Sequence, residues 1–241
     1  MSKTESEKVL EAEGVSKSYG ELDVLEEVSM TAERGRMYAL IGSNGSGKTT
    51  FLKILAGLLP PDSGEVMRRA DDAARTVGYL PQQPSFRKGF TVAETLRLYT
   101  RLLDEDVREG YVEESLEDVG LSDASGRRVS GLSGGMTRLL GVAQSRVGEP
   151  PIMAVDEPTS GLDPEMTGRI FETLAQVADE GAAVLTTTHD LDRVARHADE
   201  IVLIHDRHIA ESGPPDEVVD RRGAEDLAEV FDEVVRDGGQ V

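Results

Sequence analysis

Short apolar runs and amphipathic stretches alternate along the chain. Met37–Ile41 and Ile152–Val155 are uninterrupted apolar runs with the length of buried strands. Val9–Val15 and Val24–Met30 alternate more loosely and predict a pair of strands near the N-terminus. Further strands are expected at Thr76–Tyr79, Ala183–Thr188 and Ile201–Ile204.

Apolar residues at helical spacing separate most of these strands. A helix over Thr50–Leu58 follows the run at 37–41 and ends before Pro60-Pro61. Because strand and helix alternate, we expect an α/β fold with a parallel-sheet core. Other helices are expected at Thr91–Leu103, Tyr111–Val119, Gly134–Val147, Glu165–Asp179 and Leu191–Ala198, the first two as an insertion.

The two ends of the chain carry different signals. No apolar run approaches the roughly 18–20 residues that cross a bilayer, and residues 1–8 are polar. We therefore expect neither a membrane span nor an export signal. Near the C-terminus, apolar residues predict a short amphipathic helix that packs on its own domain: Leu227, Val230, Phe231, Val234 and Val235.

Composition narrows the function classes. The 241 residues include 26 Lys and Arg against 46 Asp and Glu, so the formal net charge is −20. This charge repels nucleic-acid phosphates and anionic lipids, which argues against a nucleic-acid-binding or polybasic membrane-surface protein. The absence of cysteine excludes disulfides, thiolate metal sites and a thiol nucleophile, and fits a cytosolic chain. The acidic residues indicate a solvated surface, which resembles the halophilic cytosolic proteins of salt-loving organisms.

A glycine-rich loop follows the apolar run at 37–41. It reads Gly42, four residues, Gly47, Lys48 and Thr49, with a strand before it and a helix after it, as a phosphate-binding loop requires. The glycines let backbone N–H groups surround a phosphate, and Lys48 neutralises the phosphate oxygens. The hydroxyl of Thr49 is a ligand for Mg²⁺. The loop therefore predicts a nucleoside triphosphate site.

A second apolar strand ends in two acidic residues. Asp156 and Glu157 directly follow Ile152–Val155. We expect Asp156 to hold Mg²⁺ and Glu157 to polarise the attacking water as a general base. On its own such a pair is more often structural, but downstream of a phosphate loop it indicates hydrolysis.

Three further motifs accompany these two. Leu132-Ser133-Gly134-Gly135-Met136 precedes the acidic pair, and Ser160-Gly161-Leu162-Asp163 and Thr188-His189-Asp190 follow it. In this order and spacing the chain resembles, over essentially its full length, the ATP-binding subunit of an ABC transporter. The resemblance implies a P-loop NTPase (RecA-like) core, an N-terminal antiparallel β subdomain and an inserted α-helical signature subdomain.

The resemblance also implies roles for single residues. Gln82, rather than Gln83, would touch Mg²⁺ and the attacking water, and His189 would contact the γ-phosphate. Leu132 to Met136 and Asp163 would act on the ATP of a second subunit, so that two chains meet head to tail. The nucleotide-binding residues would be Tyr19, stacked on adenine, with Gly42, Ser43, Asn44, Gly45, Ser46, Gly47, Lys48, Thr49 and Thr50, and the Mg²⁺ ligands would be Thr49, Gln82 and Asp156.

Two residues depart from the family pattern. Met136 replaces the common Gln of the signature, and Leu139 stands where Arg is usual, with Arg138 one place earlier. We expect altered contacts near the signature helix without loss of catalysis. The expected organisation is a single ABC ATPase domain over 1–241, with a core of 1–84 and 152–222, a helical subdomain of 85–151 and a short C-terminal helix in 223–241.

The function favoured by these motifs is ATP hydrolysis that drives a separate membrane permease. ATP and Mg²⁺ are the expected cofactors. The expected partners are a second copy or a similar subunit and an integral membrane permease, which Ser85–Leu103 would touch, and no nucleic acid. The chain would lie in the cytoplasm, on the inner face of the cell membrane.

Two questions stay open at this point. The segment Glu225–Phe231 resembles the tail of export-type subunits and favours export over import. A soluble ABC-type ATPase outside transport, for example in iron–sulfur cluster assembly, is the alternative function. A nucleotide-binding scaffold without turnover is disfavoured by Glu157.

Overall fold

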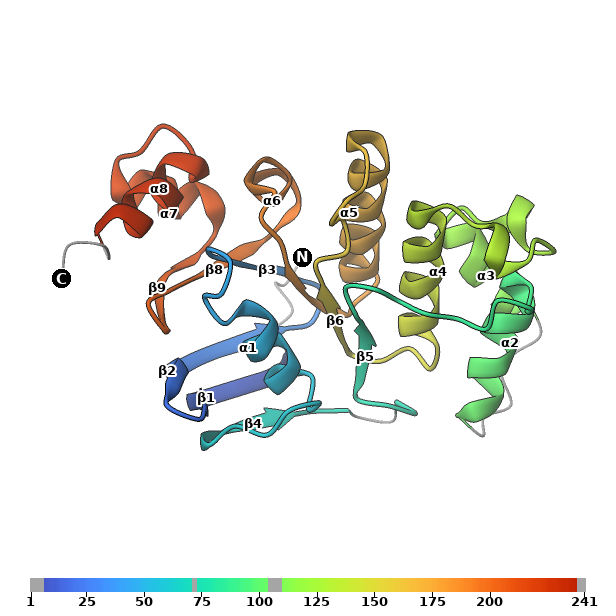
Figure 1. Cartoon of the computed structure of the whole chain (residues 1–241), viewed down its shortest axis with the longest axis horizontal. Coiled ribbons are helices and arrows are strands. Elements are labelled where there is room, and N and C mark those ends of the chain that lie inside the picture. The colour runs from blue at the N-terminus through green and yellow to red at the C-terminus, as the bar shows by residue number, and fades with distance from the viewer. Residues whose placement is uncertain (1–6, 71–72, 104–109, 238–241) are drawn as a thin grey trace, which may run out of the picture.

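The computed structural model describes residues 7–70, 73–103 and 110–237, in which the strands form two sheets (Figure 1). The smaller sheet is antiparallel, in the order β2-β1-β4: β2 (Leu22–Glu33), β1 (Lys8–Tyr19) and β4 (Ser63–Arg68). The two long strands confirm the N-terminal pair. The third strand, β4, was not predicted, because its sequence, Ser-Gly-Glu-Val-Met-Arg, has little apolar alternation. It forms through backbone pairing with β1.

The larger sheet forms the parallel core that the sequence predicts. Its order is β5-β6-β7-β3-β8-β9, and only the edge strand β9 runs antiparallel. Every residue of β3, β6 and β7 is buried, as expected when helices cover both faces of a parallel sheet. The strands are β3 (Met37–Ile41), β5 (Val77–Leu80), β6 (Ile152–Asp156), β7 (Ala183–Thr187), β8 (Glu200–His205) and β9 (His208–Gly213), the last not predicted.

Helix α1 (Lys48–Leu55) lies between the two sheets (Figure 1). Phe51 and Leu55 are fully buried in a cluster with residues of β1, β2 and the central strands. This helix begins two residues earlier than predicted, and it ends before Gly57, whose φ of +74° stops it. Its burial fixes the phosphate loop against both sheets.

The opposite face of the sheet is covered by α5 (Pro164–Asp179) and α6 (Leu191–His197), with α7 (Pro215–Arg222) and α8 (Leu227–Asp237) beyond them. The predicted C-terminal helix is confirmed, because Leu227, Val230 and Val234 are buried against the strand residues Ile201 and Leu203. Helix α7 was not predicted. No helix of the described residues is long and apolar enough to cross a membrane.

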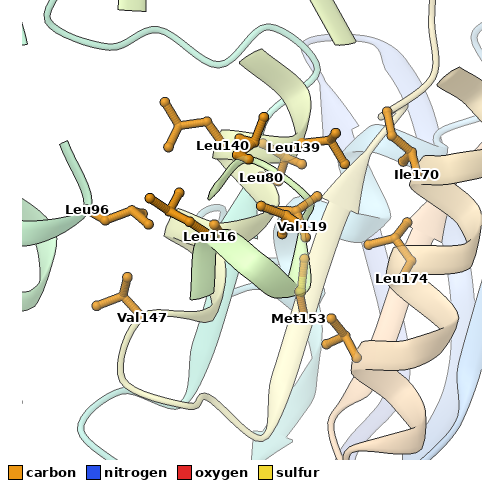
Figure 2. Packing of buried hydrophobic residues seen from close by; sticks show 14 of the residues in the cluster. Leu80, Leu96, Leu116, Val119, Leu139, Leu140, Val147, Met153, Ile170 and Leu174 are labelled. Carbon is orange, nitrogen blue, oxygen red and sulfur yellow. The ribbon is translucent and has the colours of Figure 1, made fainter. Parts of the chain in front are cut away.

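Between β5 and β6 the chain forms a group of helices beside the sheet (Figure 1): α2 (Val92–Leu102), α3 (Tyr111–Asp118) and α4 (Gly134–Arg146), with 3₁₀ turns at Ser122–Ala124 and Val129–Gly131. Thr91 caps α2, with its side chain accepting from Glu94 N. Figure 2 shows one apolar cluster that joins these helices to β5, β6 and α5, through Leu80, Leu116, Leu139, Met153 and Leu174.

Candidate functional site

The glycine-rich loop is shaped to receive an anion. Gly47 has a φ of +98°, and a Cβ on it would lie 2.9 Å from Leu25 Cδ2, so this position needs glycine. No side chain caps the N-terminus of α1, which begins at Lys48. The hydroxyl of Ser46 is buried without a hydrogen-bond partner in the described part of the chain. Free N–H groups and an unpaired hydroxyl at one helix start suit a phosphate.

Lys48 lies folded back over this loop. Its Nζ donates to the carbonyl oxygens of Gly42, at 2.8 Å, and Ser43, at 2.9 Å. Burial lowers the pKa of Lys48, and the charges of Glu157 and Asp156 act in the opposite direction. A buried ammonium held by two neutral carbonyls is ready to exchange them for anionic phosphate oxygens.

Thr49, in the first turn of α1, meets Asp156, the last residue of β6. Thr49 Oγ1 donates to Asp156 Oδ1 at 2.8 Å, and Asp156 is only 4% exposed. Thr187, at the end of β7, donates to the same carboxylate oxygen at 2.8 Å. The sequence-predicted metal ligands Thr49 and Asp156 therefore share one place, and their oxygens are of the type that Mg²⁺ prefers.

Glu157 stands directly beyond this carboxylate. Its backbone has a φ of +40°, which is uncommon for a residue other than glycine, and its N–H donates to Thr187 Oγ1 at 2.8 Å. Its carboxylate Oε2 accepts from Gln82 Nε2 at 3.0 Å. Strained backbone held by a buried neighbour is typical of functional sites. The structure thus brings together Gln82, Asp156 and Glu157, as their sequence motifs predict.

The signature motif forms a second group with the segment after Glu157. Ser133 caps α4 by accepting from Met136 N at 3.2 Å, and Asp163 caps α5 by accepting from Met166 N at 2.9 Å. A Cβ on Gly134 would lie 3.5 Å from Leu162, so the two helix starts are in contact. None of the side-chain hydrogen bonds among the described residues joins Ser133 to the phosphate loop.

Two predicted residues lie outside both groups. Tyr19, at the end of β1, is 51% exposed, and the Lys17 ammonium lies 5.9 Å from its ring centroid. His189 is exposed just after β7. Both side chains are open to solvent.

The departure at Leu139 has a structural explanation. Leu139 is 1% exposed and packs in the apolar cluster of Figure 2, where a charged side chain would be costly to bury. Arg138 is half-buried one turn before Gly141, a residue that packs on Leu80 and Pro84. The structure therefore uses position 139 for the core, while the cation at position 138 stays partly accessible.

Sequence reasoning missed two residues at the site. The first, Thr187, forms hydrogen bonds with both acidic residues. The second is Tyr79, whose pKa is raised to about 12 by burial and then by the charge of Asp156. Thr187 is the register partner of Asp156, because β6 and β7 are neighbours. The threonines that end the strand at 183–188 are only a weak indication of a polar site in the sequence. The order of the strands is what brings Thr187 next to the acidic residues.

Comparisons with known proteins agree with this geometry. A family model described as ABC transporter matches residues 25–160. The chain is 34% identical over 232 residues to the Nod factor export ATP-binding protein I of Ralstonia nicotianae, covering 92% of this chain and 72% of that one. It is 35% identical to the protein of the same name from Cupriavidus pinatubonensis, covering 92% and 71%.

Solved structures give the same result. A structure described as the ATP-binding subunit of an ABC transporter has a TM-score of 0.80 and 30% identity, covering 94% of this chain and 99% of the other. The ADP conformation of an ATP-binding cassette from an ABC transporter has a TM-score of 0.77 and 26% identity, covering 92% and 97%. The fold is therefore that of a P-loop ABC ATPase, and the chain belongs to the ABC transporter family as an ATP-binding subunit that hydrolyses ATP to drive transport.

Proposed function

We propose that this chain powers an export-type ABC transporter by hydrolysing Mg²⁺-ATP between two head-to-tail copies. The observation that carries the proposal is the chain of contacts from Thr49 through Asp156 and Thr187 to Glu157 and Gln82. These contacts support the proposal because they bring oxygen donors of the type that Mg²⁺ prefers, a second carboxylate and an amide close to a loop suited to phosphates. Export is favoured by the names of the two Nod factor relatives and by the tail at 225–231.

Glu157 is the proposed general base. Its carboxylate is oriented by the Gln82 amide, and its backbone is fixed by Thr187, so it can accept a proton from an attacking water. His189 is proposed to orient the same water beside the γ-phosphate. Thr49, Asp156 and Gln82 would hold Mg²⁺, which would neutralise charge on the phosphate oxygens. Tyr19 is proposed to stack on adenine.

The signature residues are proposed to serve the ATP of the other copy. Ser133 and Gly134 lie at the exposed N-terminus of α4, where N–H groups and the helix dipole favour an anion. Because Ser133 makes no described contact with its own phosphate loop, a second chain is needed to bring an ATP to it. Asp163, on the same surface, would then lie at the contact between the copies.

The proposed organisation is a core of 1–84 and 152–222, a helical subdomain of 85–151 and a C-terminal helix in 223–241. The permease would contact 85–103, and the chain would be peripheral on the cytoplasmic face of the membrane. Since Gln82 lies at the start of the loop that leads into this segment, permease movement can alter the contact between Gln82 and Glu157. This links transport to hydrolysis.

Light scattering on Glu157→Gln tests the two-copy arrangement. The substitution keeps the size and shape of the side chain and replaces the basic carboxylate by an amide, so ATP should be held without turnover. We expect monomers without nucleotide and dimers with saturating ATP. Lys48→Ala is the matched control, which removes the phosphate contact and should stay monomeric. Monomers of Glu157→Gln under saturating ATP, at both low and high salt, would contradict the head-to-tail dimer.

A further inference from the structure

Two segments of the helical group are basic in an otherwise acidic chain. Residues 85–101 contain four Lys and Arg against one acid, and residues 124–146 contain four Arg and no acid, although the whole chain has a net charge of −20. A protein with nearly twice as many acids as bases has carboxylates to spare for ion pairs. Within these segments Arg97 pairs with Glu113 and Arg146 pairs with Asp118, so the local excess of positive charge rests on the cations that stay unpaired.

The fold brings these segments side by side. Val92 N donates to Arg127 O at 3.0 Å, and Val129 N donates to Phe90 O at 2.9 Å. Thr91 and Arg128 form an antiparallel bridge between the two strands of chain. As a result Arg87, Lys88, Arg127 and Arg128, which we name the basic patch, share one exposed surface at the entry to α2.

The basic patch is not neutralised from within. None of its four cations forms an ion pair with any residue of the described ranges. Arg87 lies over the Phe90 ring, 5.4 Å from its centroid, and Arg127 Nη1 donates to Met136 Sδ at 3.9 Å. Glu94, the one acid of 85–101, instead accepts from Thr91 N at 2.8 Å.

Aromatic side chains adjoin the patch. Phe86 and Tyr99 pack edge to face with ring centroids 6.5 Å apart, and both are half-buried, as is Phe90. Half-buried aromatic rings surrounded by arginines are the composition of a protein–protein interface. An anionic bilayer fits less well, because its extended surface would also face the four carboxylates of the neighbouring α3, whereas a single acidic segment would touch the patch alone.

We infer that the basic patch binds an acidic cytoplasmic segment of the permease, with Asp or Glu carboxylates on the four cations and an apolar side chain on Phe86 and Tyr99. This inference rests on the proposed function and specifies the chemistry of its partner. Arginine donates in a planar fork that matches a carboxylate, which favours this pairing. The loop that starts at Gln82 carries half of the patch, so the same contact reaches the hydrolysis site.

Carbodiimide cross-linking tests the carboxylate directly, since the reagent joins a lysine amine to a carboxylate in contact with it. Membrane vesicles that contain the permease of the same transporter are treated with the full-length chain, and joined peptides are identified by mass spectrometry. We expect Lys88 to be coupled to an Asp or Glu of a cytoplasmic permease segment. Lys88→Arg keeps the charge, so it should bind as the wild type does and lose only this cross-link.

Charge reversal tests the energetic role of the patch. Lys88→Glu/Arg128→Glu should bind the vesicles at least about tenfold more weakly at about 0.1 M KCl, because like charges then face each other. The matched control, Arg69→Glu/Arg236→Glu, makes the same change in net charge at exposed sites elsewhere and should bind as the wild type does. Both variants should keep the ATPase activity of the isolated chain.

The outcomes separate the inference from the proposed function. Equal weakening by both double variants, or cross-links from Lys88 only to another copy of this chain, would overturn the basic-patch inference. Patch-dependent binding to vesicles of anionic lipid without permease would also overturn it, in favour of a lipid contact. If the wild type itself does not bind permease vesicles, the proposed transport function fails and the inference fails with it.

Discussion

Thr187→Val should show how far the activity of Glu157 depends on the Thr187 hydroxyl that holds its backbone. The substitution keeps the shape and the β-branch of the side chain and removes only its hydroxyl. That hydroxyl donates to Asp156 Oδ1 and accepts from Glu157 N, each at 2.8 Å, and the residue is 0% exposed. The two acidic residues of the site are therefore held by one buried group.

The magnitude follows from these two bonds. Loss of a hydrogen bond to a charged group costs about 1.5–3 kcal/mol, and a backbone donor left without its partner costs about 1–3 kcal/mol. Because the Glu157 N–H is only part-buried, we expect the free energy of unfolding to fall by about 2–4 kcal/mol in total. The backbone of Glu157, at a φ of +40°, would also relax, so kcat should fall by about tenfold or more.

The assay pairs urea unfolding with steady-state ATPase measurements. Thr186→Val is the matched control, since Thr186 is equally buried and its hydroxyl makes only a 3.5 Å contact with Thr187 O. Thr186→Val should lower the free energy of unfolding by less than about 1 kcal/mol and leave kcat near the wild-type value. Thr187→Ser, which keeps the hydroxyl, should restore most of the activity. Equal stability and equal kcat for Thr187→Val and Thr186→Val would refute this role for Thr187.

Three further predictions concern packing, pH and salt. Gly78→Ala should destabilise the protein by at least about 2 kcal/mol in urea unfolding, because its Cβ would lie 1.9 Å from Ser145 O, and a neutral effect would contradict this packing. Burial raises the pKa of both Tyr38 and Tyr79 to about 12, above the ordinary tyrosine pKa of about 10, so the unfolding free energy should decrease as pH rises from 10 to 12. Tyr79→Phe should reduce that decrease, and an unchanged pH profile would argue against the assignment. At a net charge of −20, the melting temperature should rise between about 0.1 M and 2 M KCl more than in sucrose of matched exclusion, whereas a flat or falling series would remove the high-salt interpretation.

The phosphate loop and the acidic end of β6 could be predicted from the sequence, because each is formed by consecutive residues. The strand at 37–41, the glycine loop and the helix after it determine their own geometry within a few residues. The same holds for the caps at Ser133 and Asp163, whose partners lie three residues along the chain. Local backbone chemistry explains these features without knowledge of the fold.

Features that depend on which strands are neighbours in the sheet could not be predicted from the sequence. Thr187 meets Asp156 only because β6 and β7 are neighbours in register, and 31 residues separate them. Strands β4 and β9 lie at sheet edges with little apolar alternation, so pairing rather than pattern forms them. The basic patch likewise arises from the bridge between Thr91 and Arg128, which no local pattern predicts.

The central claim is that Glu157 supplies the base for ATP hydrolysis while binding depends on other groups. The most direct measurement is ATP turnover by Glu157→Gln beside ATP affinity, with the wild type in the same buffer. The account predicts near wild-type affinity, because Lys48 and the loop remain, and hydrolysis at least about 10²-fold slower. Turnover within a few-fold of the wild type, at full ATP occupancy, would contradict it.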